Sequence, residues 1–189
     1  MNIIAAVEEA VKILKEGGII LYPTDTCSRI RCDATNPKAV EKVFALKKRS
    51  DSKSLIVLVD GPDMLYRYIK EVPEIADQLI EVADTPLTII YPGAVGLAAN
   101  VTAEDGSVGI RIPDHEFCKK LIYKFRRPVV STSANISGEA SPVHFGDISK
   151  DVRDGVDWCA DPDLEAGATG KPSSIIQLGL GGEIKIIRK

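Results

Sequence analysis

The sequence predicts an α/β fold, with one twisted mixed sheet flanked by helices in a single domain over residues 1–189. Segments with the apolar spacing of helices alternate with short apolar runs along the whole chain. The 189 residues, 44% hydrophobic and 27% charged, suffice for one sizeable core. No internal repeat, low-complexity tract or linker divides the sequence, so we expect one domain.

The first predicted element is a helix over residues 3–16, where apolar side chains share one helical face and two glycines follow. A short apolar run that ends at a proline predicts a buried strand at residues 19–22. Asn36 and Pro37 begin the next helix, because Asn caps free amides and Pro suits the first turn. Residues 55–59 then predict a second buried strand.

The same alternation continues to the end of the chain. Helical spacing recurs over three segments, at residues 63–70, 74–83 and 116–125. Strands are predicted at residues 87–91, 108–112, 128–131, 174–178 and 183–187. A glycine-containing turn separates the last two strands and predicts a hairpin.

Charge and hydropathy restrict the function classes. With 24 Lys and Arg against 27 Asp and Glu, the net charge of −3 gives no global positive field for general nucleic-acid binding. No apolar run approaches the roughly 20 residues of a membrane-spanning helix. The N-terminus shows no basic segment leading into an apolar one, so it does not resemble a signal peptide. We therefore expect a cytoplasmic protein that does not contact a membrane.

The cysteines stand at positions 27, 32, 118 and 159. They form no Cys-x-x-Cys pair and have no His cluster beside them, which argues against a zinc site. A chain of this length without an export signal also argues against a disulfide framework. We expect buried free thiols.

Two polar segments follow predicted strands, where α/β folds present ligand sites. Thr24, Asp25 and Thr26 can hydrogen-bond a small polar ligand, although the same residue types favour a plain turn. The second segment is Ser131-Thr132-Ser133-Ala134-Asn135-Ile136-Ser137-Gly138. Its small residues leave backbone amides open to a phosphate or carboxylate. No His or Asp is spaced to make its serines nucleophiles, so binding is the better interpretation.

A basic cluster follows the second predicted helix, with four cations in the seven residues 47–53. Lys47, Arg49 and Lys53 are what a polyphosphate requires, because Arg grips phosphate oxygens in pairs and Lys supplies a compact charge. Basic residues also stabilise a helix C-terminus through its macrodipole, so both interpretations stay open.

Five segments in register resemble the YrdC-like family: Tyr22-Pro23-Thr24-Asp25-Thr26, Lys47-x-Arg49, Gly109-x-Arg111-x-Pro113, the serine-rich segment at 131–138, and Pro172-Ser173-Ser174. The resemblance runs from about residue 5 to Arg188 and is closest to the short, single-domain type. It implies a twisted α/β sheet with a large, positively lined cavity.

The resemblance also implies an activity, the synthesis of threonylcarbamoyl-AMP and pyrophosphate from L-threonine, bicarbonate and ATP. Mg²⁺ accompanies ATP. Separate proteins are expected to transfer the threonylcarbamoyl group to the adenosine beside the anticodon of certain tRNAs.

Site residues carry over by position. The resemblance assigns Thr24, Lys53 and Ser173 to threonine binding. The resemblance assigns nucleotide binding to Lys47, Arg49, Ser131, Ser133 and Asn135. It assigns Arg111 and Arg188 to the phosphate or adenylate region of the nucleotide. Thr26 is a weaker candidate and His115 is kept as a pocket-rim group. No residue is assigned a covalent or general acid–base role, and the metal ligands are unknown.

One segment departs from the family pattern, which has an aromatic residue and then Gly-x-Gly after the position of Cys27. Here Ser28 stands at the aromatic position, and Arg29 and Arg31 replace the two glycines. On a strand the two arginines point the same way. Either they add cations to the ligand cavity or they perturb the loop that closes it.

Two other functions compete with the synthase. A non-catalytic module for double-stranded RNA would use the 47–53 cluster with Arg29 and Arg31, but the net charge and 5% aromatic content argue against it. A carbamoyl-phosphate-using relative, as found inside hydrogenase-maturation proteins, is disfavoured by the lack of accessory domains and zinc motifs.

Overall fold

The computed structural model describes residues 2–48, 55–165 and 169–189. Its helices are α1 (Ile3–Lys15), α2 (Pro37–Leu46), α3 (Pro62–Tyr68), α4 (Ile75–Val82), α5 (Glu116–Phe125) and α6 (Lys150–Asp154), with 3₁₀ turns at Phe145–Asp147 and Pro162–Glu165. Its strands are β1 (Ile20–Tyr22), β2 (Arg29–Arg31), β3 (Ile56–Leu58), β4 (Leu87–Tyr91), β5 (Val108–Arg111), β6 (Val129–Ser133), β7 (Trp158–Cys159), β8 (Ser174–Leu178) and β9 (Ile184–Arg188).

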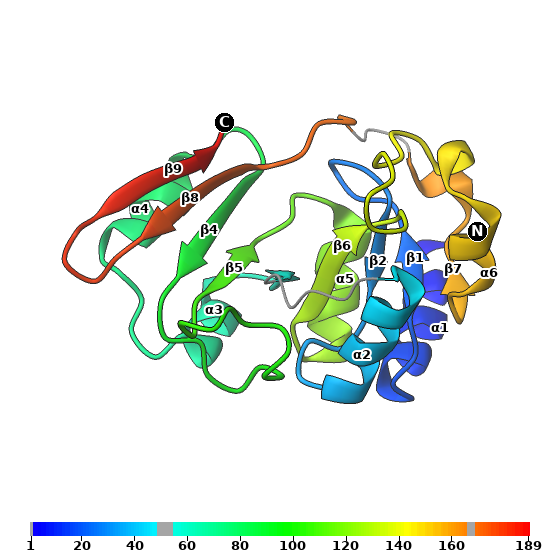
Figure 1. The fold of residues 1–189 in the computed structure, drawn as a ribbon, viewed down its shortest axis with the longest axis horizontal. Coiled ribbons are helices and arrows are strands. Elements are labelled where there is room, and N and C mark those ends of the chain that lie inside the picture. Colours follow the sequence, from blue (N-terminus) through cyan, green and yellow to red (C-terminus); the bar gives the residue numbers. More distant parts are fainter. Residues whose placement is uncertain (1, 49–54, 166–168) are drawn as a thin grey trace.

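Within the described residues, the nine strands form one sheet in the order β7-β1-β2-β6-β3-β5-β4-β8-β9 (Figure 1). The pairs β1–β7, β3–β5 and β4–β8 are parallel, and the other neighbours are antiparallel. This confirms the predicted mixed sheet. Strand β6 pairs with both β2 and β3 and so joins the two halves of the sheet.

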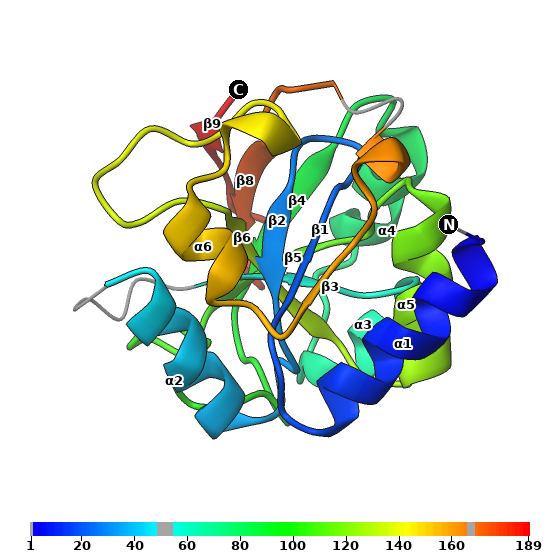
Figure 2. The ribbon, with the colours of Figure 1, turned by 90° about the vertical axis from the view of Figure 1, so that its right-hand side faces the viewer.

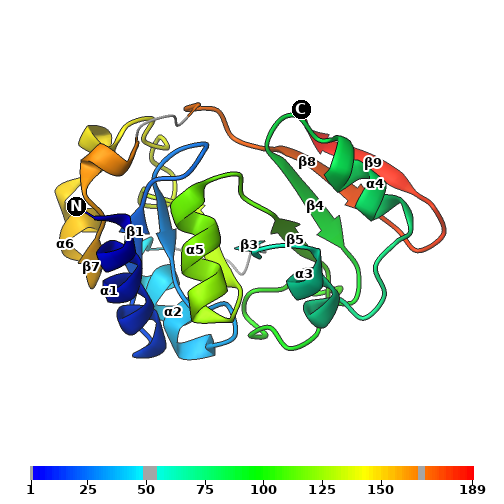
Figure 3. The same ribbon diagram turned by 180° about the vertical axis from the view of Figure 1, so that it is seen from behind.

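Helices cover both sides of the sheet. Figure 2 shows α2 and α6 on one side of the strands and α1 and α5 on the other. From behind, α1 and α5 lie side by side over the β1 end, while α3 and α4 lie toward β4 (Figure 3). The core is built from the apolar faces of these helices and the buried strands, as their sequence spacing predicts.

Capping residues set the helix boundaries as the sequence predicts. The Asn36 side chain accepts hydrogen bonds from the amides of Lys38 and Ala39, and Pro37 opens α2. Gly17 follows α1 with a φ of 77°, a left-handed conformation that glycine adopts without strain. The predicted terminal hairpin is present as β8 and β9.

The free thiols also agree with the sequence analysis. All four cysteines are free; Cys27, Cys32 and Cys118 are buried, and Cys159 is half-buried. Among the described residues, no helix combines the length and apolar character that crossing a bilayer requires.

Candidate functional site

Strand register shows which predicted site residues share one face of the sheet. Side chains directly opposite each other on paired strands, and those two residues along, point to the same face. Arg29 on β2 lies opposite Ser133 on β6. Ser131, two residues before Ser133, lies in register through β3 with Gly109 on β5. Arg111, two residues after Gly109, therefore belongs to the same face.

The same face continues across β4 to the edge of the sheet. Gly109 pairs with Ile90, and Thr88 stands two residues before it. Through β8, Thr88 is in register with Arg188 on β9. A Cβ atom at Gly109 would lie 3.3 Å from Thr88 Cγ2, which confirms that the two residues are neighbours on this face. We call the face that carries Arg29, Ser131, Ser133, Arg111, Thr88 and Arg188 the site face.

Lys47 joins this face from the end of α2. Its ammonium Nζ donates to the carbonyl oxygens of Ser133, at 2.6 Å, and Asn135, at 2.7 Å. The Ser133 hydroxyl and the Asn135 amide oxygen are each 3.4 Å away. The lysine is 3% exposed. Lys47, the first residue of the basic cluster, and the serine-rich segment, far apart in sequence, thus lie side by side.

Thr24, Asp25 and Thr26 form a hydrogen-bonded turn after β1. The Thr24 hydroxyl lies 2.9 Å from that of Thr26 and donates to the carbonyl oxygen of Cys27 at 2.8 Å. Asp25 pairs with Arg111, and both side chains are largely buried. Arg111 also donates to the Thr26 hydroxyl at 3.4 Å, while its Nε atom is buried without a partner. The segment thus forms a turn, and the turn adjoins the site face.

Ser173 lies at the β9 end of the site face. Arg188 donates to the carbonyl oxygen of Ser173 from Nε at 2.9 Å and from Nη2 at 2.6 Å. The Ser173 hydroxyl lies 2.8 Å from the Thr88 hydroxyl, and Ser173 is 3% exposed. Arg49 and Lys53, the other two predicted site residues, lie outside the described residues.

Arg29 and Arg31 form β2, a strand that the apolar pattern did not predict. They share one face of the strand, as their spacing predicts. Arg31 is fully buried, and its guanidinium lies 5.2 Å from the centre of the Tyr22 ring. Arg29 is half-buried, and its pKa is lowered first by burial and also by the positive charges of Arg31, Arg111 and Arg188. By register with Ser133, Arg29 lies on the site face.

His115, predicted at a pocket rim, is bonded to the strand core. Its Nδ1 atom lies 2.7 Å from the hydroxyl of Tyr22, which also lies 3.2 Å from the sulfur of Cys118. Tyr22 stacks on Phe117 with ring centres 4.0 Å apart. Burial is the main cause that raises the pKa of Tyr22 well above its usual value, with Cys118 next. The sequence analysis missed this cluster; a tyrosine ending an apolar run and a histidine before a helix were its only signals.

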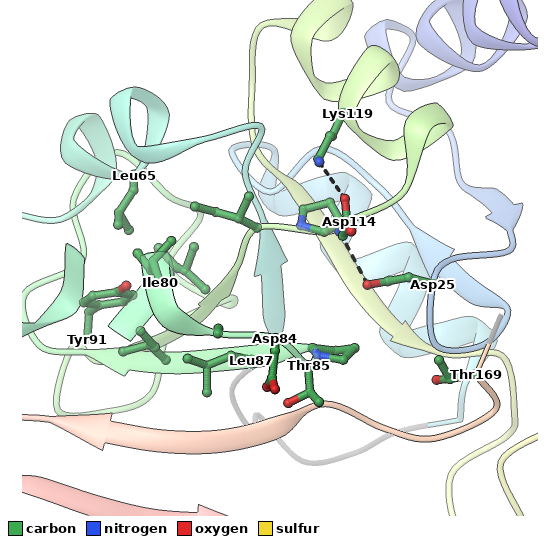
Figure 4. A pocket seen from close by; sticks show the side chains of 16 residues that line it. Asp25, Leu65, Ile80, Asp84, Thr85, Leu87, Tyr91, Asp114, Lys119 and Thr169 are labelled. Atoms are coloured by element: carbon green, nitrogen blue, oxygen red, sulfur yellow. Dashed lines mark hydrogen bonds and ion pairs between the residues drawn. The ribbon is translucent and has the colours of Figure 1, made fainter. Parts of the chain in front are cut away.

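A separate pocket of about 440 Å³ lies on the opposite face of β4 and β5. Apolar side chains line most of it, among them Leu65, Ile80, Ile89, Tyr91 and Ile110 (Figure 4). Its charged side chains are Asp25, Asp84, Asp114 and Lys119. With more carboxylates than ammonium groups, this pocket differs from the positively lined cavity that the resemblance implies.

Comparison with known proteins places the fold. Residues 12–189 match the family model Sua5/YciO/YrdC, described as telomere recombination. The threonylcarbamoyl-AMP synthase of Pseudoalteromonas translucida is 28% identical over 174 residues, covering 90% of this chain and 92% of that protein. The synthase of the same name from Vibrio campbellii is 34% identical over 135 residues, covering 70% of this chain and 73% of the relative.

Solved structures agree. Sua5 from P. abyssi, in complex with L-threonine, superposes with a TM-score of 0.83 at 30% identity, covering 91% of this chain and 50% of Sua5. This chain therefore spans about half the length of that protein. MTH1692 from Methanobacterium thermoautotrophicum has a TM-score of 0.71 at 31% identity, covering 96% of this chain and 85% of MTH1692. From the family match and these relatives, the chain belongs to the Sua5/YciO/YrdC family.

Proposed function

We propose that this chain is a threonylcarbamoyl-AMP synthase that forms threonylcarbamoyl-AMP, pyrophosphate and water from L-threonine, bicarbonate and ATP. The observation that carries the proposal is the contact of Lys47 with Ser133 and Asn135. It joins Lys47 to the serine-rich segment at the face that also carries Arg111 and Arg188. The similarity to relatives that bear the name of this synthase supports the same reaction.

The nucleotide is assigned to basic and hydroxyl side chains of the site face. Lys47, Arg49, Ser131, Ser133 and Asn135 hold ATP, and Arg111 and Arg188 lie toward its phosphates. Positive charge here offsets the negative charge that builds on the triphosphate as the α-phosphorus is attacked. Arg111 is positioned for this by Asp25 and the Thr26 hydroxyl. The basic cavity that the resemblance implies is assigned to this face.

Threonine is assigned to Thr24, Lys53 and Ser173. The amine of threonine attacks the carbon of CO₂ or bicarbonate, and an oxygen of the resulting carbamate displaces pyrophosphate from ATP. No covalent enzyme intermediate is needed, so holding the two reactants together supplies most of the catalysis. Exclusion of water protects the short-lived carbamate.

Mg²⁺ is proposed to enter with ATP, held by phosphate oxygens, and to neutralise part of the triphosphate charge. Within the described part of the chain, no three His, Cys, Asp or Glu side chains gather as a metal site. The donor set on the site face is cationic and hydroxylic, which fits an ion that the triphosphate itself carries. The product is proposed to pass to separate proteins that modify tRNA in the cytoplasm.

The test is direct. Purified protein is incubated with ATP, Mg²⁺, L-threonine and bicarbonate, and pyrophosphate and the adenylate product are measured. We expect pyrophosphate release that depends on threonine and bicarbonate, and we expect Lys12→Ala, an exposed substitution on α1, to match the wild type. Retention of double-stranded RNA without turnover, weakening steeply with salt, would instead support a binding module.

A further inference from the structure

The two arginines of β2 carry charges that the described chain does not neutralise. Arg31 is fully buried, and its Nε, Nη1 and Nη2 atoms all lack a hydrogen-bond partner. Arginine stays protonated in proteins and presents five N–H donors, so a buried arginine that serves only packing normally has those donors satisfied. A buried charge without a partner is among the most unfavourable features of a folded chain. Its presence indicates a partner that is not part of the described chain.

The nearby acidic groups are already engaged. Asp25 pairs with Arg111. Asp33, two residues after Arg31, accepts a hydrogen bond from Arg127 at 2.9 Å. Tyr22 and Cys118 lie beside Arg31, but burial raises the pKa of both side chains, so both stay neutral near pH 7. Among the side chains that the structure describes, no carboxylate therefore pairs with Arg31 or Arg29.

Arg29 brings this charge to the site face. It is half-buried, lies two residues before Arg31 on the same face of β2, and is opposite Ser133 on β6. It also feels the repulsion of Arg31, Arg111 and Arg188. The charges of Arg31, Arg111 and Arg188 thus all act on Arg29, and Asp25 is the one carboxylate that the described residues show paired with any of these four arginines. Such an excess of like charge needs an anion to be favourable.

We infer that Arg29 and Arg31 form a phosphate-binding subsite at the β2 end of the site face. The Arg29 guanidinium contacts the phosphate oxygens, and Arg31, on the same face of β2, supplies a second charge from its buried position. Two cations balance a doubly charged phosphate group, and the planar guanidinium fork matches two of its oxygens. The identity of the ligand, a nucleotide polyphosphate or its released pyrophosphate, rests on the proposed function; the subsite itself rests on the unpaired charges.

Binding of inorganic pyrophosphate and of ATP to the full chain tests the subsite by isothermal titration calorimetry. The variants are Arg29→Gln and Arg31→Met, with Arg67→Met on the exposed side of α3 as the matched control. We expect each β2 variant to weaken pyrophosphate binding at least about tenfold, as expected for a lost charged contact. Arg67→Met should stay within about twofold of the wild type.

A second measurement separates binding from packing. Without ligand, Arg31→Met should raise the melting temperature, because it removes a buried unpaired charge, while the further rise produced by pyrophosphate becomes smaller. A loss of affinity for both ligands places free pyrophosphate on the subsite; a loss for ATP alone limits the subsite to the nucleotide.

Wild-type affinity for both ligands in Arg29→Gln overturns the inference, and this variant decides the matter even if Arg31→Met does not fold. The measurements can refute the subsite and the synthase activity independently of each other. Pyrophosphate binding that depends on Arg29, without threonine-dependent turnover, overturns only the proposed function. Turnover with pyrophosphate and ATP binding unchanged in both variants overturns only the subsite.

Discussion

The Nζ atom of Lys47 lies 2.6 Å from the carbonyl oxygen of Ser133, which is 86 residues farther along the chain. The backbone returns the contact, since the amide of Ser137 donates to the carbonyl oxygen of Lys47 at 2.9 Å. These bonds fix the end of α2 against the segment that follows β6. They explain how a lysine at the end of one helix and small polar residues after a distant strand come together.

Replacing Lys47 or Arg49 by alanine should weaken ATP binding by at least about 1–2 kcal/mol, the scale of a lost charged hydrogen bond. Lys47→Ala should also destabilise the fold, because it leaves two backbone carbonyl acceptors without their buried donor. Calorimetric titration with ATP, alongside urea unfolding, measures both effects. Lys12→Ala is the control, and unchanged ATP affinity in both site variants would remove them from the nucleotide site.

The Asp25–Arg111 pair should contribute more to stability than an exposed ion pair. The two side chains are 13% and 6% exposed, so Asp25→Asn leaves a nearly buried cation unpaired and should cost about 3 kcal/mol. The exposed pair of Asp114 with Lys119 is the internal comparison, and Asp114→Asn should cost less than about 1 kcal/mol. Free energies of unfolding in urea decide the point; equal losses in the two variants would contradict it.

Secondary structure was predictable wherever apolar spacing or a cap determined it, as in α1, α2 and the β8–β9 hairpin. Strand β2 was not predicted because two of its three residues are arginines, so the segment lacks the apolar pattern that indicates a buried strand. Strand β7 is two residues long, and α6 has five residues and one buried position, Val152. Their structure depends on pairing and packing with distant segments, which local pattern does not contain.

Motif order predicts which residues are candidates for the site, but the sequence does not show their contacts. Nothing in the spacing of Lys47 and Ser133 shows that the lysine bonds to backbone carbonyls, since any residue supplies those acceptors. The bond between Tyr22 and His115 was likewise invisible, because strand register and the position of α5 create it. The pocket between β4 and α4 was not predicted for the same reason, because the sequence does not distinguish its lining residues from ordinary core residues.

Stability should fall at alkaline pH because of Tyr22. An unfolded tyrosine ionises near pH 10, whereas burial raises the pKa of Tyr22 in the folded protein. The unfolded chain therefore loses its proton first, so the stabilisation is complete below about pH 10 and is lost as the pH rises toward the folded value. Urea unfolding between about pH 9 and 11 measures the slope, which should be smaller in Tyr22→Phe. Exposed Tyr123→Phe should keep the wild-type slope, and a Tyr22→Phe slope equal to wild type would refute the assignment.

Ser173 offers a test of the threonine side that leaves the nucleotide side intact. Its hydroxyl is held by Thr88 at 2.8 Å, and its carbonyl oxygen is held by Arg188, so its position is fixed before any substrate binds. Ser173→Ala should therefore raise the KM for threonine about five- to tenfold, the equivalent of about 1 kcal/mol, and leave the KM for ATP unchanged. Ser174→Ala is the matched control, because the neighbouring side chain on β8 points to the opposite face. Equal changes in the two KM values would show that Ser173 supports the fold of the site without facing threonine.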